Sequence, residues 1–316
     1  MRAAVLGSPI AHSLSPVLHR AAYAELGFAD WTYEAVECTE ADLAAFVRSR
    51  GPEWAGLSLT MPLKRTVLPL LDHVDPLAAV TGGANTVVFR PDGRYGYNTD
   101  VQGIVDALTE AGAPAPGSVT ILGAGATACS ALAALAELGA KSADVVARDP
   151  ARAADLLTAA DRLHVRVRLL PFTDLTAPTP APAPTTPTPA AATHTPAAAT
   201  HTPAATVNDI VNSSPRGDSA PGLLISTVPA GAADGYAERI RVTGRAPATV
   251  FDVVYAPWPT ALAEAAAAAG AVVVSGFAML LHQAAAQVEL MTGKPAPLEA
   301  MRAAGEAELA RRNAVS

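Results

Sequence analysis

The sequence predicts an α/β protein with two domains. Strand-like and helix-like segments alternate along the first hundred residues, and the glycine-rich turn GAGATA at 123–128 lies between a strand-like and a helix-like segment. A chain of 316 residues, 50% of them hydrophobic, has enough apolar material for a separate core in each domain. We therefore expect an amino-terminal α/β domain followed by a Rossmann-like domain.

Short apolar segments and amphipathic segments alternate in the amino-terminal domain. Ser15 and Pro16 are typical of a helix N-cap and first turn, and an apolar stripe runs from Leu18 until Gly27 ends the helix. This pattern favours parallel connections between strands. Strand-like segments lie at 3–7, 31–37, 55–60 and 84–89, and helix-like segments lie at 15–27 and 41–50.

The second domain is predicted to start near residue 101. A strand-like segment at 119–122, the glycine turn, an alanine-rich helix and a strand-like segment at 144–147 form one βαβ unit of a doubly wound sheet. Strand character returns at 222–231 and 248–255, and helix-like segments at 278–293 and 297–312 complete the chain.

Residues 176–221 differ sharply from the rest of the chain, because they consist largely of Pro, Thr and Ala and repeat the heptads THTPAAA and THTPAAT. Such a composition cannot build a packed core, so we predict a disordered surface insertion. His194 and His201 lie in these repeats, and we interpret them as incidental rather than as metal ligands.

Composition and charge exclude several classes of function. The 22 basic and 29 acidic side chains give a net charge of −7, which disfavours nucleic acid and anionic membranes as partners. Cys38 and Cys129 lack metal-site spacing and are few enough to fit a reducing cytoplasm. The most apolar segment, at 271–290, contains polar residues that make a membrane span improbable. No HExxH or CxxC motif indicates a metal site.

Two short strings place a lysine and a carboxylate where they could share a proton. Lys64 ends LTMPLK, and Asp100 ends GYNTD. Together with a glycine turn that can hold a dinucleotide pyrophosphate, they predict hydride transfer at an oxygen-bearing carbon. The alternatives are that Lys64 is a solvated surface lysine and that Asp100 is the N-cap of the following helix.

Seven strings in this order resemble the shikimate dehydrogenase family: SPIAHSLSP at 8–16, SLTMPLK at 58–64, GGANTV at 82–87, YNTD at 97–100, GAGATA at 123–128, FDVVY at 251–255 and GFAMLLHQAA at 276–285. The resemblance implies a substrate-binding and catalytic domain formed by residues 1–100 and 276–316. It also implies a Rossmann-like NADP-binding domain at 101–275, which would contain the insertion. The two domains would face each other across a cleft.

The resemblance implies an NADP-dependent oxidoreductase that interconverts 3-dehydroshikimate and shikimate, in the pathway to chorismate and the aromatic amino acids. Lys64 and Asp100 would handle the proton, and the protein would act as a monomer or homodimer. Two alternatives stay open. One is a quinate/shikimate dehydrogenase that prefers NAD, and the other is a non-catalytic NADP-responsive binding protein of the same fold.

The family's substrate-binding positions carry short donors and acceptors that suit a carboxylate and ring hydroxyls. Ser15 could instead only cap its helix, and the ring of Tyr255 could belong to the core. The positions that match the family's substrate-binding residues are Ser13, Ser15, Thr60, Asn85, Tyr255 and Gln283.

The predicted cofactor-binding site consists mainly of the glycine turn and of two arginines that follow the next strand. Arg148 and Arg152 suit a 2′-phosphate and favour NADP, whereas Asp149 between them would favour NAD unless it caps the helix that begins at Pro150. The family commonly has asparagine where Ser58 stands. The positions expected to bind the cofactor are Gly123, Ala124, Gly125, Ala126, Arg148, Arg152, Gly276 and Met279.

Overall fold

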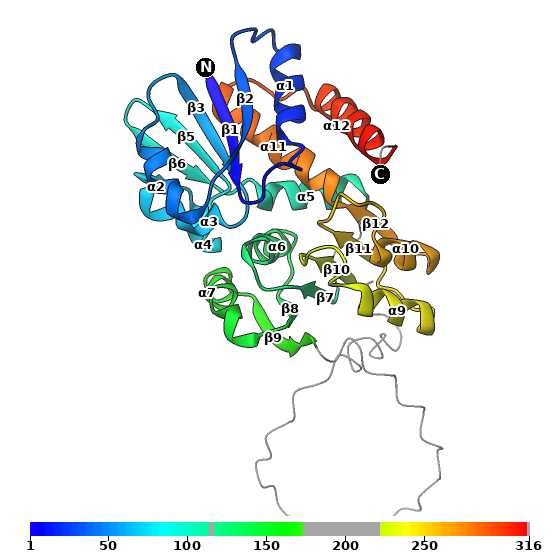
Figure 1. The fold of residues 1–316 in the computed structure, drawn as a ribbon. Coiled ribbons are helices and arrows are strands. Elements are labelled where there is room, and N and C mark those ends of the chain that lie inside the picture. Colours follow the sequence, from blue (N-terminus) through cyan, green and yellow to red (C-terminus); the bar gives the residue numbers. More distant parts are fainter. Residues whose placement is uncertain (114–116, 173–221, 315–316) are drawn as a thin grey trace, which may run out of the picture.

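A computed structural model describes residues 1–113, 117–172 and 222–314. Its two lobes each contain a six-stranded sheet, and they lie one above the other in Figure 1. The α/β class and the Rossmann-like second lobe are confirmed. The predicted insertion at 176–221 lies outside the described residues.

The first sheet is mixed rather than parallel throughout. Its strands follow the order β2-β1-β3-β5-β6-β4, in which β1 runs parallel to β2 and β3 while β5 runs antiparallel to β3 and β6. The expectation of parallel connections is therefore wrong for β5 and β6, which form a hairpin around a two-residue loop. The strands are β1 (Arg2–Gly7), β2 (Thr32–Glu37), β3 (Trp54–Leu59), β4 (His73–Val74), β5 (Thr86–Arg90) and β6 (Gly93–Tyr97).

Helices from both ends of the described chain cover the first sheet. Residues of α1, α11 and α12 form one apolar cluster, which includes Leu18, Leu281 and Met301, so the carboxyl-terminal helices belong to the first lobe (Figure 1). The helices of this lobe are α1 (Ser15–Glu25), α2 (Glu40–Arg48), α3 (Leu63–Thr66), η1 (Leu68–Leu70), α4 (Pro76–Thr81), α11 (Gly276–Thr292) and α12 (Leu298–Asn313).

The second sheet is parallel and doubly wound. Its order β12-β11-β10-β7-β8-β9 places the first strand, β7, beside the fourth, β10, so the strand order reverses at the middle of the sheet. In such sheets, ligands bind at the carboxyl end of the strands at this reversal. The strands are β7 (Val119–Leu122), β8 (Ser142–Ala147), β9 (Arg166–Pro171), β10 (Leu223–Ser226), β11 (Thr249–Asp252) and β12 (Val272–Ser275).

Each face of the second sheet packs against helices because successive side chains alternate between the faces. Ile121 belongs to one buried cluster together with residues of α6, whereas Leu122 belongs to another together with residues of α9. Buried strands of this kind are nearly continuous apolar runs. The helices of this lobe are α5 (Asp100–Glu110), α6 (Ala126–Glu137), η2 (Pro150–Ala153), α7 (Ala154–Leu163), α9 (Asp234–Thr243) and α10 (Ala261–Ala268).

Two predicted helix starts can be compared with the structure. Ser15 is the first residue of α1 rather than its N-cap, and the Oγ atom of Ser13 accepts the Ser15 N–H at 3.2 Å. Asp149 does cap the turn that begins at Pro150, because its Oδ1 atom accepts the Ala151 N–H at 3.0 Å. Within the described part of the chain, no helix is both long and apolar enough to cross a membrane.

Candidate active site

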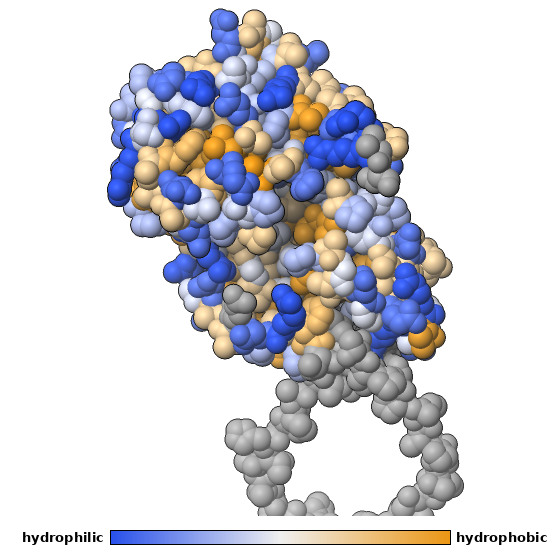
Figure 2. Space-filling view, in the orientation of Figure 1, coloured by the Kyte–Doolittle hydropathy of each residue, from blue (hydrophilic) through white to orange (hydrophobic). Residues whose placement is uncertain are grey.

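A cavity of about 270 Å³ lies where the two lobes meet, and Figure 2 shows this face of the molecule hollowed between them. Its wall combines residues of β3, the ends of α1 and α5, the loop after β11 and the face of α11. All the predicted catalytic and substrate-binding residues line it: Ser13, Ser15, Thr60, Lys64, Asn85, Asp100, Tyr255 and Gln283.

Lys64 and Asp100 form an ion pair in this cavity. The Nζ atom of Lys64 donates to Oδ2 of Asp100 at 2.5 Å, and the two side chains are 15% and 5% exposed. Asp100 is the first residue of α5, and its carboxylate contacts Lys64 and Asn85 rather than capping the helix. Neither the solvated-lysine alternative nor the simple N-cap alternative describes these side chains.

Asn85 connects the ion pair to the rest of the cavity. Its Nδ2 atom donates to Oδ1 of Asp100 at 2.8 Å and to Oγ1 of Thr99 at 2.9 Å, and lies 3.2 Å from Oε1 of Gln283. Its Oδ1 atom accepts the backbone N–H of Thr99 at 2.9 Å. With both ends of its amide engaged, buried Asn85 has a fixed orientation.

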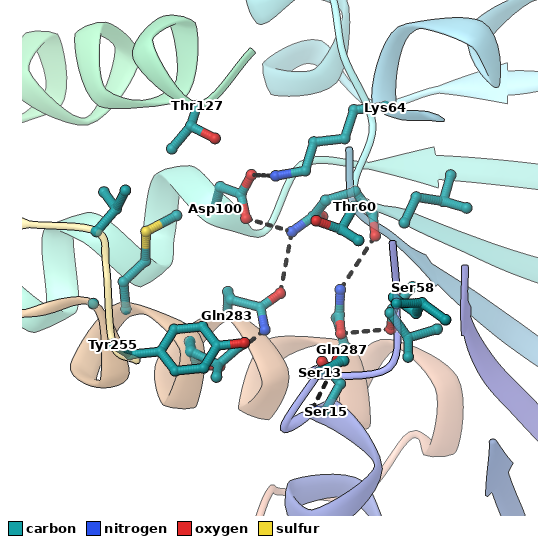
Figure 3. Close-up of a pocket in the computed structure, with 18 of the residues that line it drawn as sticks. Ser13, Ser15, Ser58, Thr60, Lys64, Asp100, Thr127, Tyr255, Gln283 and Gln287 are labelled. Atoms are coloured by element: carbon teal, nitrogen blue, oxygen red, sulfur yellow. Dashed lines mark hydrogen bonds and ion pairs between the residues drawn. The ribbon is translucent and has the colours of Figure 1, made fainter. Parts of the chain in front are cut away.

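The remaining polar groups surround the same space from several elements. Figure 3 shows Ser13 and Ser15 at the start of α1, Thr60 after β3, Tyr255 on the loop after β11 and Gln283 on α11. Burial raises the pKa of the Tyr255 hydroxyl, which therefore stays protonated and can donate a hydrogen bond at neutral pH. The cavity thus offers hydroxyl and amide groups together with one ammonium group.

Two of the predicted cofactor residues also line this cavity. Gly276 begins α11 so close to the end of β11 that an added Cβ would lie 1.9 Å from the carbonyl oxygen of Val253. No side chain fits there, which explains the glycine. Met279 follows on the same helix and is buried.

The other predicted cofactor residues lie outside the cavity wall, at the carboxyl ends of β7 and β8. Gly123 has φ of +104°, and a Cβ there would lie 2.5 Å from Oγ1 of Thr227 at the end of β10. Gly125 has open space around it and forms the N-cap of α6. Ala124 lies between these glycines, and Ala126 opens the helix. The turn therefore lies at the reversal of strand order, with the first amides of α6 beside it.

Arg148 and Arg152 lie beyond the end of β8. The Arg148 side chain is exposed directly after the strand, and Arg152 belongs to η2, with its side chain outside the described part. The carboxylate of Asp149 between them already accepts a backbone N–H, which fulfils the capping role predicted for it.

The cavity wall also contains polar residues that were absent from the predicted site, among them Ser58, Thr127 and Gln287. Ser58 and Gln287 are buried, and their hydroxyl and amide groups bond to each other at 2.7 Å. Gln287 follows Gln283 by four residues, so the two lie on one face of α11, and that spacing was the available signal. Thr127 is the second residue of α6, within the string GAGATA, and points toward the ion pair in Figure 3.

The comparisons with known proteins agree with this geometry. Residues 5–87 match the family model described as shikimate dehydrogenase substrate binding domain, and residues 276–304 match the shikimate 5′-dehydrogenase C-terminal domain. A shikimate dehydrogenase (NADP(+)) of Synechococcus sp. (strain JA-2-3B'a(2-13)) is 32% identical over 312 residues, which cover 97% of this chain and 95% of the relative.

Solved structures of similar fold extend over nearly the whole chain. Mycobacterium tuberculosis shikimate dehydrogenase has a TM-score of 0.76 and 40% identity, covering 97% of this chain and 99% of that one. Shikimate 5-dehydrogenase of Thermus thermophilus, in complex with NADP(H) and shikimate, has a TM-score of 0.72 and 28% identity, with coverage of 97% and 99%. The chain therefore belongs to the shikimate dehydrogenase family.

Proposed function

We propose that the protein is an NADP-dependent oxidoreductase that interconverts 3-dehydroshikimate and shikimate. The observation that carries this proposal is the Lys64–Asp100 ion pair, which lies inside a cavity rich in hydroxyl and amide groups beside a Rossmann-like sheet. Membership of the family and the NADP-dependent relative support the same reaction.

Recognition of the substrate is assigned to the polar wall of the cavity. Ser13 and Ser15 would donate to the carboxylate of the acid from the start of α1, while Thr60, Asn85 and Gln283 would contact ring hydroxyls. The protonated hydroxyl of Tyr255 adds one more donor from the second lobe. A small polyhydroxylated acid matches this set of groups better than an apolar ligand does.

The residues at the strand reversal fit a dinucleotide. Gly123 permits close packing against β10, the space beside Gly125 is open, and the N-terminus of α6 offers amide donors to a pyrophosphate. A nicotinamide held between Gly276 and the cavity would supply or accept a hydride at the reacting carbon.

Lys64 carries out proton transfer on the other side of that carbon. In the reduction, its ammonium group donates a proton to the carbonyl oxygen and stabilises the negative charge that develops there; in the oxidation, the neutral amine accepts the proton. Asp100 holds the Nζ atom in place and exchanges the proton with it. Burial of both side chains keeps bulk water from competing for these hydrogen bonds.

We propose the domain boundaries expected from the sequence: residues 1–100 and 276–316 bind substrate, and residues 101–275 bind NADP. The packing of α11 and α12 against α1 supports the discontinuous first domain. We further propose a monomer or homodimer in the cytoplasm, where the buried free thiols of Cys38 and Cys129 would stay reduced.

One observation keeps an NAD-preferring quinate/shikimate dehydrogenase as the second candidate. Asp149 follows Arg148 at the end of β8, where an acidic residue commonly binds the ribose hydroxyls of NAD. Its carboxylate is engaged by the Ala151 N–H, so it acts as a cap, and the exposed Arg148 remains for the 2′-phosphate. We therefore favour NADP.

The deciding experiment follows the absorbance of reduced cofactor while the protein oxidises shikimate or quinate with NADP or NAD. We expect the highest kcat/KM with shikimate and NADP. The Lys64→Ala variant should lower kcat by on the order of 10² to 10⁴, because a positioned acid-base group contributes that much, while it still binds NADP. Quinate or NAD preference would favour the second candidate. Absence of turnover with all four pairs, with NADP still bound, would indicate a binding protein.

A further inference from the structure

Gln287 is a buried amide whose hydrogen bonds are all committed within the protein. It lies one turn beyond Gln283 on α11 and lines the cavity. Its Nε2 atom donates to the carbonyl oxygen of Asn85 at 3.2 Å and to Oγ1 of Thr86 at 2.9 Å. Its Oε1 atom accepts from Oγ of Ser58 at 2.7 Å, a bond that Figure 3 marks. A buried amide is costly only when it lacks hydrogen-bond partners, and here the partners fix the orientation of Gln287.

The direction of each hydrogen bond can be deduced from the backbone. The carbonyl oxygen of Asn85 can only accept, so it faces the NH₂ group of Gln287, and the Oε1 atom of Gln287 must face Ser58. The Ser58 hydroxyl therefore donates its single proton to Gln287. It is left to accept, which it does from the Tyr33 hydroxyl at 2.6 Å.

The same reasoning applies on the other side of Gln287. Because Thr86 receives a hydrogen from Gln287, its hydroxyl donates to Oδ1 of Asn85 at 2.8 Å. The backbone N–H of Thr99 also donates to this Oδ1 atom, which turns the NH₂ group of Asn85 toward Asp100. These hydrogen bonds form one series, which runs from Tyr33 through Ser58, Gln287, Thr86 and Asn85 to Asp100. At each step the donor lies on the Tyr33 side and the acceptor on the Asp100 side.

The series begins at Tyr33, beside the proposed substrate-binding residue Ser15, and ends on the carboxylate of Asp100. Tyr33 lies on β2, does not line the cavity and is almost completely buried, and this burial raises the pKa of its hydroxyl. It thus stays a donor at any pH at which the protein works. The side chain of Ser15 is a further hydrogen-bond partner of the Tyr33 hydroxyl.

We propose that Tyr33, Ser58 and Gln287 are positioning residues that act through Asn85 on Asp100. Hydrogen bonds aligned in one direction polarise one another, and a low-dielectric interior strengthens them. They hold the Asn85 amide on one carboxylate oxygen, so that the other oxygen stays aimed at the lysine. Such preorganisation of the charged groups is a large part of catalysis. This inference rests on the proposed function.

The first test removes one oxygen atom far from the substrate. Tyr33→Phe deletes the first donor, whereas Tyr23→Phe is the matched control: Tyr23 belongs to the same aromatic cluster, is equally buried, and its hydroxyl has no partner among the described residues. We expect Tyr33→Phe to lower kcat about five-fold, with KM for shikimate within about two-fold, because the loss falls on the reacting groups rather than on binding. Tyr23→Phe should leave both constants unchanged.

The second test asks whether the two ends of the series act as one unit. Gln287→Met keeps the length of the side chain but removes three hydrogen bonds, and we expect it to lower kcat about ten-fold or more. Once the hydrogen bonds of Gln287 are removed, Tyr33→Phe should lower kcat no further, so the kcat of the double variant should equal that of Gln287→Met alone. If the two substitutions acted independently, the factors by which they lower kcat would instead multiply.

The outcomes separate this inference from the function on which it rests. No turnover of shikimate by the unmodified protein would remove the proposed function. Normal turnover with equal kcat for Tyr33→Phe and Tyr23→Phe, or losses that multiply in the double variant, would overturn the positioning role alone. If Gln287→Met does not fold, the Tyr33→Phe comparison still decides, since a change in KM without a change in kcat also contradicts the proposal.

Discussion

Single residues in this protein show how burial gives ordinary side chains defined roles. Lys64 and Asp100 would be unremarkable on a surface, where an ion pair contributes little. Here the pair is largely shielded from solvent, and Asn85 occupies the second carboxylate oxygen. The charges are thus held in one geometry, which is what proton transfer to a bound substrate requires.

His19 gives a prediction about stability and pH. It is completely buried, stacks on Tyr33 and bonds the carbonyl oxygen of Ser15, and burial lowers its pKa from 6.5 to about 4. The unfolded chain therefore binds a proton that the folded protein does not, between those two values. The contribution of His19 is fully present above pH 6.5, is lost as the pH falls toward 4, and amounts to about 3 kcal/mol.

Urea unfolding at pH 7.5 and pH 4.5 measures this contribution. His19→Phe keeps a ring against Tyr33 but cannot titrate, so its free energy of unfolding should fall less on acidification than that of the unmodified protein. Other groups titrate equally in both proteins and cancel in the comparison. Equal losses in the two proteins would show that His19 does not carry the effect.

Arg148 gives a prediction about cofactor choice. If its exposed guanidinium binds a 2′-phosphate, Arg148→Ala should raise KM for NADP about ten-fold and leave KM for NAD nearly unchanged, since only NADP carries that group. Lys141→Ala is the control, because it removes one exposed cation from the opposite end of β8. Steady-state kinetics with both cofactors would contradict the assignment if both KM values rose together.

The site residues were predictable from the sequence where each belongs to a short string, as Lys64 and Asp100 do. The hydrogen bond between Ser58 and Gln287 was not predictable, although Ser58 belongs to such a string, because the two residues lie 229 positions apart and the bond exists only after the lobe has folded. A buried polar side chain and a solvated one look alike in sequence. Only the packing of α11 on the first sheet distinguishes them.

At the scale of helices and strands, sequence patterns identified the parallel units better than the hairpin. The βαβ unit around the glycine turn is strongly patterned, because its strands are buried on both faces. By contrast, β5 and β6 pair across a two-residue loop, and β6 contains two glycines and two tyrosines rather than an apolar run. A strand without an apolar run or a regular alternation gives little local pattern from which it could be identified.

The close packing of α5 against α11 leads us to predict that a larger residue at Gly103 destabilises the protein. Gly103 lies where the helices approach so closely that an added Cβ would be 2.9 Å from both Cβ of Gln283 and the carbonyl oxygen of Met279. Gly103→Ala should therefore force the helices apart and lower the free energy of unfolding by roughly 1–3 kcal/mol, as overpacking does. Since α5 begins with Asp100, kcat should fall as well.

Thermal unfolding and steady-state kinetics of Gly103→Ala would test this prediction. Gln102→Ala is the control, because Gln102 is the neighbouring residue on the exposed side of α5. It should change neither the melting temperature nor kcat appreciably. A Gly103→Ala variant with unchanged stability would mean that the two helices can adjust without cost.

For the whole molecule, we predict that the Pro/Thr/Ala-rich segment is dispensable. Deletion of residues 179–206 shortens the connection between β9 and β10, and the entropy of closing such a connection changes by only about 0.6 kcal/mol for each halving of its length. We expect unchanged kcat, KM for NADP and melting temperature. A large rise in KM for NADP in a folded deletion variant would contradict an inert insertion.

The packing of α11 and α12 against α1 also bears on how the protein is made. A chain leaves the ribosome from its amino terminus, so the first sheet appears early, but the helices that close its core appear only after the strands of the second sheet. The parallel sheet of the second lobe is by then fully synthesised. Leu18 and its neighbours in the first lobe therefore stay uncovered until α11 and α12 have been synthesised. Nascent chains of this protein are accordingly expected to depend most on chaperones just before α11 and α12 emerge.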